Sequence, residues 1–341
     1  MTKKPASAPS TMADIARLAG VSASTVSRAL AGSPLVAKKK RELIAKLARE
    51  RGYVVNATAR NLRLQRTQTI AVTIPMGHES SQSLADPFFV EMLGHLADAI
   101  TQRGYSILLQ KILPTTNADD WLQQLITGNR SDGIIVIGQS TEHKLLDRAA
   151  AGYLPLVVWG GHLEKQRYCT VGTDNVGGAL AATEHLLNSG RRNIVFLGDA
   201  SIPEIKLRHE GYRRALQRGP KGTAAPRIVP AHLTADAAYE SVRAFIREGA
   251  KFDAIVAGTD VIAISAMRAI RAAGLSVPKD VAVTGFDDIA LAAHTVPPLT
   301  TVRQDLARGA HMLVDLLMQR IGGTETPSAT MPGELIVRES A

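Results

Sequence analysis

The first residues suited to chemistry are hydroxyls and one arginine within a single short helical segment. Ser22 is placed to cap a helix over Ala23–Ala29, and the positions that this helix would expose are Ala23, Ser24, Thr25, Ser27 and Arg28. Hydroxyls and the backbone N–H groups of a helix N-terminus suit phosphate oxygens, while the fork of an arginine suits the O6/N7 edge of guanine. These residues therefore predict a contact with nucleic acid.

A second set of polar residues suits a small ligand. Asp287 follows a predicted strand that ends near Phe286, and a carboxylate there can accept paired hydrogen bonds from neighbouring hydroxyls. Arg208 can donate a fork to a sugar oxygen or to an anion. Because ligands of open α/β sheets bind beyond the carboxyl ends of the strands, both residues are candidates for a binding site.

Aromatic residues accompany this second set. Phe88 and Phe89 follow the first predicted strand, and Trp159 ends the fourth. Aromatic faces suit the apolar side of a sugar ring or a planar base. The simpler alternatives are packing of Phe88 or Trp159 in a core, and helix capping by Asp260 or Asp288.

Motifs for common enzyme chemistry are missing from the chain. No two glycines are spaced i, i+2, which excludes a G-x-G-x-x-G dinucleotide loop, and neither G-x-x-x-x-G-K-[ST], H-E-x-x-H nor G-x-S-x-G occurs. The nine His show no metal-like spacing, and Cys169 is the only cysteine, so a disulfide within the chain and a cysteine-based zinc site are excluded. We expect no catalytic residue, metal or cofactor; the enzyme alternative is a sugar-processing α/β enzyme with a basic arm.

Positive charge is concentrated at one end of the chain. The 341 residues carry a net charge of +9, but residues 1–66 carry +11 and the rest carries −2. This asymmetry predicts a polyanionic partner, nucleic acid before a membrane. No apolar run of about 18 residues could span a membrane, and no apolar segment follows the first basic residues, as a secretory signal requires. The expected location is the cytoplasm, which disfavours a free-standing binding protein for transport.

Three short helices are expected to hold the basic segment, at Met12–Ala19, Ala23–Ala29 and Lys38–Arg51. Gly20 supplies a left-handed residue that ends the first helix. The apolar stripes place Leu18 and Leu43 on the inner faces of their helices. Helix, tight turn and helix form the helix-turn-helix pattern, in which the second helix enters the major groove of DNA.

The remainder of the chain alternates apolar runs with amphipathic stretches. Strands are expected at Ile70–Pro75, Ser106–Gln110, Gly133–Gly138, Leu156–Trp159, Asn193–Gly198, Ala254–Gly258 and Val281–Phe286. Helices are expected at Phe88–Arg103, Asp119–Gly128, Glu142–Ala151, Gly177–Ser189, Glu204–Arg218, Ala235–Glu248, Asp260–Ala273 and Leu306–Ile321. This order is typical of parallel sheets covered on both faces. Its length favours two doubly wound subdomains over one.

The run from Thr11 to Leu30, TMADIARLAGVSASTVSRAL, resembles the N-terminus of the lactose-repressor (LacI/GalR) family of bacterial transcription regulators. The likeness continues through Arg51–Leu62, RGYVVNATARNL. It implies DNA contacts from Thr11 and the second helix, and a hinge helix that folds on DNA and enters the minor groove. In that hinge it implies roles for Asn56, Ala59, Arg60 and Leu62, with Leu62 as the wedge that opens a base step. The alternative for Leu62 is a place in the core of the neighbouring domain, and Val55 stands where family members commonly have Pro.

The same family resemblance extends along the rest of the chain. Matching pieces are DPFF at 86–89, DNVGG at 174–178, RHEGY at 208–212, GTD at 258–260, VPKD at 277–280, GFDD at 285–288, PLTT at 298–301 and ELIVRE at 334–339. They imply a two-lobed core like that of periplasmic binding proteins, in which the chain crosses between lobes three times. They also imply effector contacts from Phe88, Phe89, Arg208, Thr259 and Asp287.

The resemblance also sets domain boundaries and a function. It implies a headpiece at 1–56 with its motif at 12–30, a hinge helix and linker at 57–66, one core subdomain at 67–172 plus 304–331, and the other at 173–303 plus 332–341. We expect a homodimeric transcriptional regulator, a repressor, that binds operator DNA under the control of a small-molecule effector. Trp159 stands where the family often has Asp, which favours a sugar or glycoside; a purine or a phosphosugar is the alternative.

Overall fold

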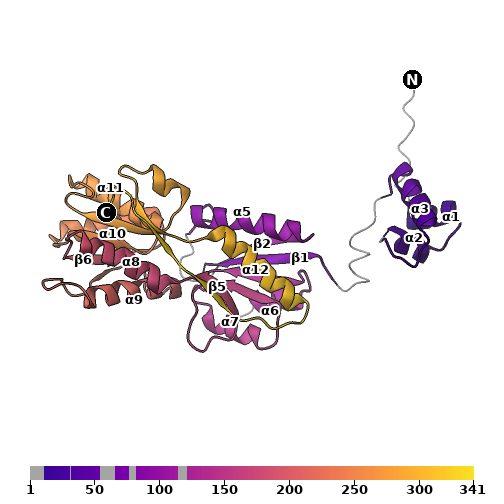
Figure 1. Cartoon of the computed structure of the whole chain (residues 1–341), viewed down its shortest axis with the longest axis horizontal. Helices are drawn as coiled ribbons and strands as arrows, with labels where there is room; N and C mark the ends of the chain where they lie inside the picture. The colour runs from indigo at the N-terminus through magenta and orange to yellow at the C-terminus, as the bar shows by residue number, and fades with distance from the viewer. Residues whose placement is uncertain (1–10, 31, 54–65, 77–81, 114–120) are drawn as a thin grey trace, which may run out of the picture. The chain divides into compact units, whose positions relative to one another are not determined.

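The computed structural model describes residues 11–30, 32–53, 66–76, 82–113 and 121–341. The chain divides into two compact units, Met1–Thr67 and Gln68–Ala341, which are described separately. We call the first unit the headpiece and the second the core (Figure 1). Four positions predicted to contact DNA, Asn56, Ala59, Arg60 and Leu62, lie outside the described residues.

The headpiece contains the three predicted helices, α1 (Met12–Ala19), α2 (Ala23–Leu30) and α3 (Lys38–Glu50). They pack around an apolar cluster built on Ile15, Val26 and Ile44. A capping box starts α1, because the Thr11 side chain accepts from Asp14 N and the Asp14 side chain accepts from Thr11 N. Gly20 ends α1 with φ +62°, a conformation that glycine adopts without steric cost.

Two apolar residues of the headpiece, which were predicted on the inner faces of their helices, are exposed. Leu18 is 45% exposed and Leu43 is 46% exposed. Each helix buries a narrower stripe than its apolar residues suggested, with only Ile15 and Ala16 fully buried in α1, and Ile44 and Ala48 in α3. Met12, Ala19 and Leu47 are partly buried against the same cluster.

The core holds two six-stranded sheets. The first has the order β11-β5-β4-β3-β1-β2 and the second has the order β12-β10-β9-β8-β6-β7. The strands of the first are β1 (Thr69–Pro75), β2 (Ser106–Ile112), β3 (Gly133–Ile137), β4 (Leu156–Trp159), β5 (Cys169–Thr173) and β11 (Ala329–Met331). Those of the second are β6 (Ile194–Leu197), β7 (Ile228–Val229), β8 (Ala254–Ala257), β9 (Ala282–Asp287), β10 (Thr300–Arg303) and β12 (Glu334–Ile336). All neighbours run parallel except β10 and β12.

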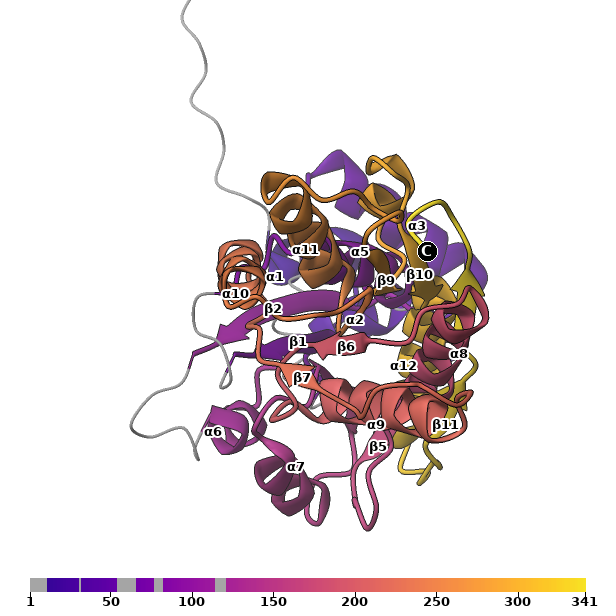
Figure 2. The same ribbon diagram turned by 90° about the vertical axis from the view of Figure 1, so that its left-hand side faces the viewer.

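Helices cover both faces of each sheet, as the uninterrupted apolar strands predicted. On the first sheet, α5 (Pro87–Gln102) and α12 (Leu306–Ile321) pack together on one face, and α6 (Trp121–Thr127) and α7 (His143–Ala150) pack on the other (Figure 1). On the second, α10 (Ala235–Arg247) and α11 (Asp260–Ala272) oppose α8 (Asn175–Asn188) and α9 (Pro203–Gln217), as Figure 2 shows. We call each sheet with its helices a lobe.

Strand alternation explains these separate cores. Val195 and Leu197 of β6 pack toward α10 and α11, whereas Ile194 and Phe196 pack toward α8 and α9. Successive side chains of a strand point to opposite faces, so one short apolar run supplies both cores.

The chain passes between the lobes after Thr173, after Arg303 and after Met331. These crossings lie next to one another. Asp174 N donates a hydrogen bond to Met331 O (2.7 Å), and Arg303 pairs with Glu334 in the second sheet. The family's three crossings are therefore present; the exact subdomain boundaries stay a prediction.

All eight predicted core helices exist, with ends that differ by at most two residues, and α12 matches its prediction at both ends. The predicted strands also exist, but β5, β7, β10, β11 and β12 were not foreseen. Within the described part of the chain, no helix is both long and apolar enough to cross a membrane. The same residues contain no group of three His, Cys, Asp or Glu side chains that could hold a metal ion.

Candidate functional site

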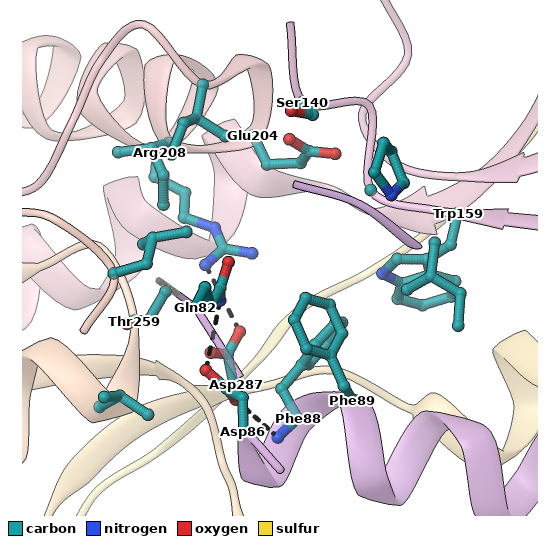
Figure 3. Close-up of a pocket in the computed structure, with 17 residues that line it drawn as sticks. Gln82, Asp86, Phe88, Phe89, Ser140, Trp159, Glu204, Arg208, Thr259 and Asp287 are labelled. Carbon is teal, nitrogen blue, oxygen red and sulfur yellow. Dashed lines mark hydrogen bonds and ion pairs between the residues drawn. The ribbon is translucent and has the colours of Figure 1, made fainter. Parts of the chain in front are cut away.

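A pocket lies between the two lobes of the core, at the carboxyl ends of strands from both sheets. Pro75, Ile137 and Trp159 come from strand ends of the first sheet, and Thr259 and Asp287 come from those of the second (Figure 3). The pocket holds about 710 Å³ of space that no protein atom fills, part of it open to solvent.

All six residues predicted to contact an effector line this inter-lobe pocket: Phe88, Phe89, Trp159, Arg208, Thr259 and Asp287. The structure thus brings together residues spread over 200 positions of the sequence. Their role in binding stays a prediction, but their convergence on one pocket is a structural fact.

Arg208 is fixed in the pocket wall by contacts on several sides. Its Nε donates to Asn175 Oδ1 (2.8 Å) and its Nη1 donates to Gly258 O (2.6 Å). The guanidinium also lies over the Phe286 ring, 3.7 Å from its centre. Figure 3 shows the other terminal nitrogen turned toward the open pocket. Burial lowers the pKa of Arg208, and nearby carboxylates, Asp287 first, oppose that shift.

Asp287 ends β9 with a backbone φ of +124°, in a region that L residues rarely adopt. Such a conformation costs on the order of 1–3 kcal/mol and persists when surrounding contacts enforce it. Here Gln304 Nε2 donates to Asp287 Oδ1 (2.7 Å), and Arg208 Nη1 lies 3.4 Å from the same oxygen. Burial raises the pKa of Asp287, while the Arg208 charge acts in the opposite direction.

Asp86 is a third polar group of the pocket, and the prediction had not included it. Its Oδ1 caps α5 by accepting from Phe88 N (3.0 Å), and its Oδ2 accepts from Gln82 Nε2 (3.3 Å). The cap orients the first turn of α5, so that Phe88 and Phe89 meet edge to face with centroids 5.6 Å apart. Burial raises the pKa of Asp86.

Glu204 also lines the pocket and was not predicted, although its spacing from Arg208 could have indicated it. It precedes Arg208 by four residues on α9, so the two side chains share one helix face. Its Oε1 accepts a hydrogen bond from Gln139 N (3.0 Å), which joins α9 of one lobe to the loop after β3 of the other. Burial raises the pKa of Glu204.

The structure decides the simpler alternatives for these residues, which were core packing of Trp159 and helix capping by Asp260 or Asp288. Trp159 belongs to the apolar cluster of the first lobe and also lines the pocket, where Figure 3 shows its ring nitrogen toward the open space. Thr259, not Asp260, caps α11, with its Oγ1 accepting from Ile262 N (3.3 Å). Asp260 instead accepts from Ile289 N (2.9 Å) and from Thr301 Oγ1 (2.5 Å). Asp288 pairs with Arg303 and Arg338.

The headpiece presents the predicted nucleic-acid residues on α1 and α2. Ser22 Oγ accepts from Thr25 N (3.2 Å), which is the expected cap of α2. Ser22, Ala23, Ser24 and Arg28 are exposed, and Thr25 and Ser27 are half-buried. The side of α2 that faces away from the headpiece core therefore consists of small residues, hydroxyls and one arginine. Thr11 is exposed at the start of α1, where its side chain is held in the capping box.

Two protein-family models match this chain. The model described as bacterial regulatory proteins, lacI family, matches residues 11–56, and the model described as a periplasmic binding protein-like domain matches residues 183–341. They coincide with the helical headpiece and with the second lobe and the C-terminal elements.

Characterised relatives match nearly the full length. The HTH-type transcriptional regulator CelR of Thermobifida fusca is 32% identical over 343 residues, covering 97% of this chain and 98% of the relative. The HTH-type transcriptional regulator AscG of Escherichia coli K12 is 31% identical over 333 residues, with 97% and 98% covered.

Solved structures agree with these relatives. A complex of the transcriptional regulator CelR with cellobiose is 30% identical, with a TM-score of 0.71 and 97% and 100% of the two chains covered. A lac repressor dimer bound to operator and the anti-inducer ONPF is 25% identical, with a TM-score of 0.85 and 98% and 99% covered. The expected fold is confirmed, and these relatives are regulators, not enzymes.

Proposed function

The chain belongs to the lacI family of bacterial regulatory proteins, and on this premise we propose that it is a repressor controlled by a neutral sugar or glycoside. The headpiece binds operator DNA, and the effector binds in the inter-lobe pocket. The relatives include a ribose operon repressor of Haemophilus influenzae, 29% identical over 338 residues, which supports the repressor assignment.

The observation that carries the choice of effector is the balance of charge in the pocket. Asp86, Glu204 and Asp287 line it beside one cation, Arg208. Carboxyl oxygens accept hydrogen bonds from hydroxyls, whereas the phosphate of a phosphosugar would find a single guanidinium among three carboxyl groups to bind it. The pocket therefore favours a neutral ligand rich in hydroxyl groups.

The aromatic wall supports the same choice. Phe88, Phe89 and Trp159 contribute ring surface on the side of the pocket opposite Arg208 (Figure 3). A sugar ring has an apolar face that packs on such rings while its hydroxyls meet the polar wall. Both walls together suit a glycoside, and the CelR complex with cellobiose shows that a relative of this fold binds a disaccharide.

A binding screen on the full-length protein tests the effector class. Cellobiose, glucose, glucose 6-phosphate and adenine are compared by thermal shift, because a ligand that binds only the folded state raises its stability by about 2.7 kcal/mol at a hundredfold excess over Kd. We expect a neutral sugar to stabilise the core. Stabilisation by adenine alone would contradict the proposal, and so would stabilisation by glucose 6-phosphate alone that Asp287→Ala removes.

DNA binding is tested on a duplex selected by the protein from a randomised library. Fluorescence anisotropy of that duplex, measured with and without the sugar found in the screen, reports the regulatory link. We expect the sugar to change the duplex affinity, and by linkage the duplex to change the sugar affinity by the same factor. A sugar that binds without changing the duplex affinity would contradict control by the effector.

The same proposal assigns individual residues to the parts of the DNA that they contact. Arg28 and the hydroxyls of α2 contact the major groove, and Thr11 contacts the backbone. Asn56, Ala59, Arg60 and Leu62 form the hinge in the minor groove. Two copies bind a pseudo-palindromic operator as a dimer in the cytoplasm. The lac repressor dimer on its operator supports the dimer, and analytical ultracentrifugation of the full-length protein tests it.

A further inference from the structure

A second pocket lies on the outer side of the first lobe, between α7 and the loop that leads into β5. Its walls carry Lys144 and Arg148 of α7 and Lys165 and Arg167 of the loop, with Glu142 and Asp147 beside them. It holds about 1210 Å³ of space, counted with its open mouth. We propose that this pocket binds phosphate or a phosphomonoester.

The four cations face the pocket for local structural reasons. Lys144 and Arg148 are four residues apart on α7 and therefore share a helix face. In the loop, the Gln166 side chain turns inward, where its Oε1 accepts from Leu163 N (2.7 Å) and its Nε2 donates to Thr170 Oγ1 (2.9 Å). Its neighbours Lys165 and Arg167 are exposed.

The acidic residues do not cancel this charge. Asp147 Oδ1 already accepts a hydrogen bond from Arg167 N (2.8 Å), and its Oδ2 lies 3.7 Å from His143 Nε2. That carboxylate thus holds the loop against α7. With Glu142 and Asp147 ionised, the six side chains still sum to +2. Cations that face one another across a pocket repel, and a bound dianion would remove that repulsion.

The chemistry of this pocket differs from that of the inter-lobe pocket. Its lining includes no aromatic residue, and its cations outnumber its carboxylates by two to one, whereas three carboxyl groups face one cation between the lobes. The two pockets nevertheless share one segment of chain. Gly138 and Ser140 line the inter-lobe pocket, and Thr141 and Glu142, next in sequence, line the second. A bound phosphate would therefore hold the segment that forms part of the effector pocket.

The test is calorimetric titration of the full-length protein with inorganic phosphate and with glucose 6-phosphate, in the absence of DNA and sugar. Lys165→Glu with Arg167→Glu changes the loop wall, and Lys144→Gln with Arg148→Gln changes the helix wall independently. The matched control is Lys221→Glu with Lys251→Glu, two exposed lysines of the other lobe. We expect both pocket variants to bind the anion about tenfold more weakly or worse, and the control to bind like wild type. Binding should weaken as KCl is added.

Comparison of the two titrants identifies the source of the anion. Tighter binding of glucose 6-phosphate than of phosphate indicates a phosphomonoester, and equal or weaker binding indicates free phosphate. Equal affinity of wild type, both pocket variants and the control would place the anion elsewhere, for example on the basic headpiece, and would overturn the proposal. No measurable binding to wild type would also overturn it. The four replaced cations line the second pocket and not the inter-lobe pocket, so these outcomes are independent of the proposed function.

Discussion

Hydrogen bonds hold in place the polar residues that are predicted to bind the effector in the inter-lobe pocket. Arg208 contacts Asn175, Gly258 and Asp287, and Asp287 also binds Gln304. The sequence predicted Arg208 and Asp287 because their side-chain types stand where ligands of α/β sheets bind. The i, i+4 spacing from Arg208 could have indicated Glu204, but its hydrogen bond with Gln139 depends on the distance across the lobes and could not be predicted.

Replacement of Asp287 by Ala should remove the response to sugar. The variant loses the acceptor of Gln304 and of Arg208, so sugar affinity should fall by about 1–3 kcal/mol, roughly 5- to 150-fold. Duplex affinity without sugar should stay at the wild-type value, because Asp287 lies in the core unit. Calorimetry measures the first quantity and anisotropy the second. Asp236→Ala, an exposed carboxylate of α10, is the control; a fully retained response in D287A would remove Asp287 from the site.

The raised pKa of Asp287 predicts a pH dependence of stability. The folded protein holds this proton more tightly than the unfolded chain, so the group's contribution to the free energy of unfolding falls as pH rises above about 4, the ordinary carboxyl pKa. Asp287→Asn has no proton to lose. The variant should therefore gain stability relative to wild type between about pH 5 and pH 7.5 in urea unfolding of the core. An unchanged or opposite difference would disprove this ionisation.

At the scale of elements, the sequence predicted long helices and buried strands well and short polar strands poorly. The five missed strands are two to five residues shorter than β1, and β5 reads Cys-Thr-Val-Gly-Thr. Such segments become strands because adjacent strands of a sheet offer them hydrogen bonds. Which strands are adjacent is known only from the tertiary structure. The inward position predicted for Leu18 and Leu43 was wrong for a related reason, since three short helices have too little surface to cover every apolar residue.

Helix α2 should carry operator discrimination through Arg28. Arg28→Ala should lose about 1–3 kcal/mol of preference for the selected duplex if Arg28 reads a base edge. Arg17→Ala, which changes an exposed arginine of α1, is the matched control. Anisotropy with the selected duplex and with a scrambled one separates the two roles. An equal loss on both duplexes would identify Arg28 as a phosphate contact.

Helix α12 supports the pocket from behind through Gly309. A Cβ atom at Gly309 would lie 2.3 Å from the Trp159 ring, so Gly309→Ala should displace the indole and weaken sugar binding. The shift is read from Trp159 fluorescence in a Trp121→Phe background, since the chain has two Trp. Gly94→Ala on α5 has open space at its Cβ and is the control. Wild-type fluorescence and sugar affinity in G309A would show that α12 does not set the ring position.

At the scale of the whole molecule, the two units divide the work. The headpiece contains the basic charge, and the core contains the inter-lobe pocket. A chain that begins at Gln68 should therefore bind sugar with wild-type affinity and should not bind duplex DNA at low salt, where phosphate contacts are strongest. Calorimetry and anisotropy on this fragment provide the measurement. Duplex binding by the fragment would show that the core itself contacts DNA.

The three adjacent crossings between the lobes have a mechanical consequence. A protease that cuts one connection leaves two intact, so a nicked core should migrate as two fragments in denaturant yet remain a single particle in buffer. Three neighbouring connections permit rotation of the lobes about one line and oppose twisting or sliding in other directions. Under the proposed function, the effector opens or shuts the core by rotation of the lobes about that line.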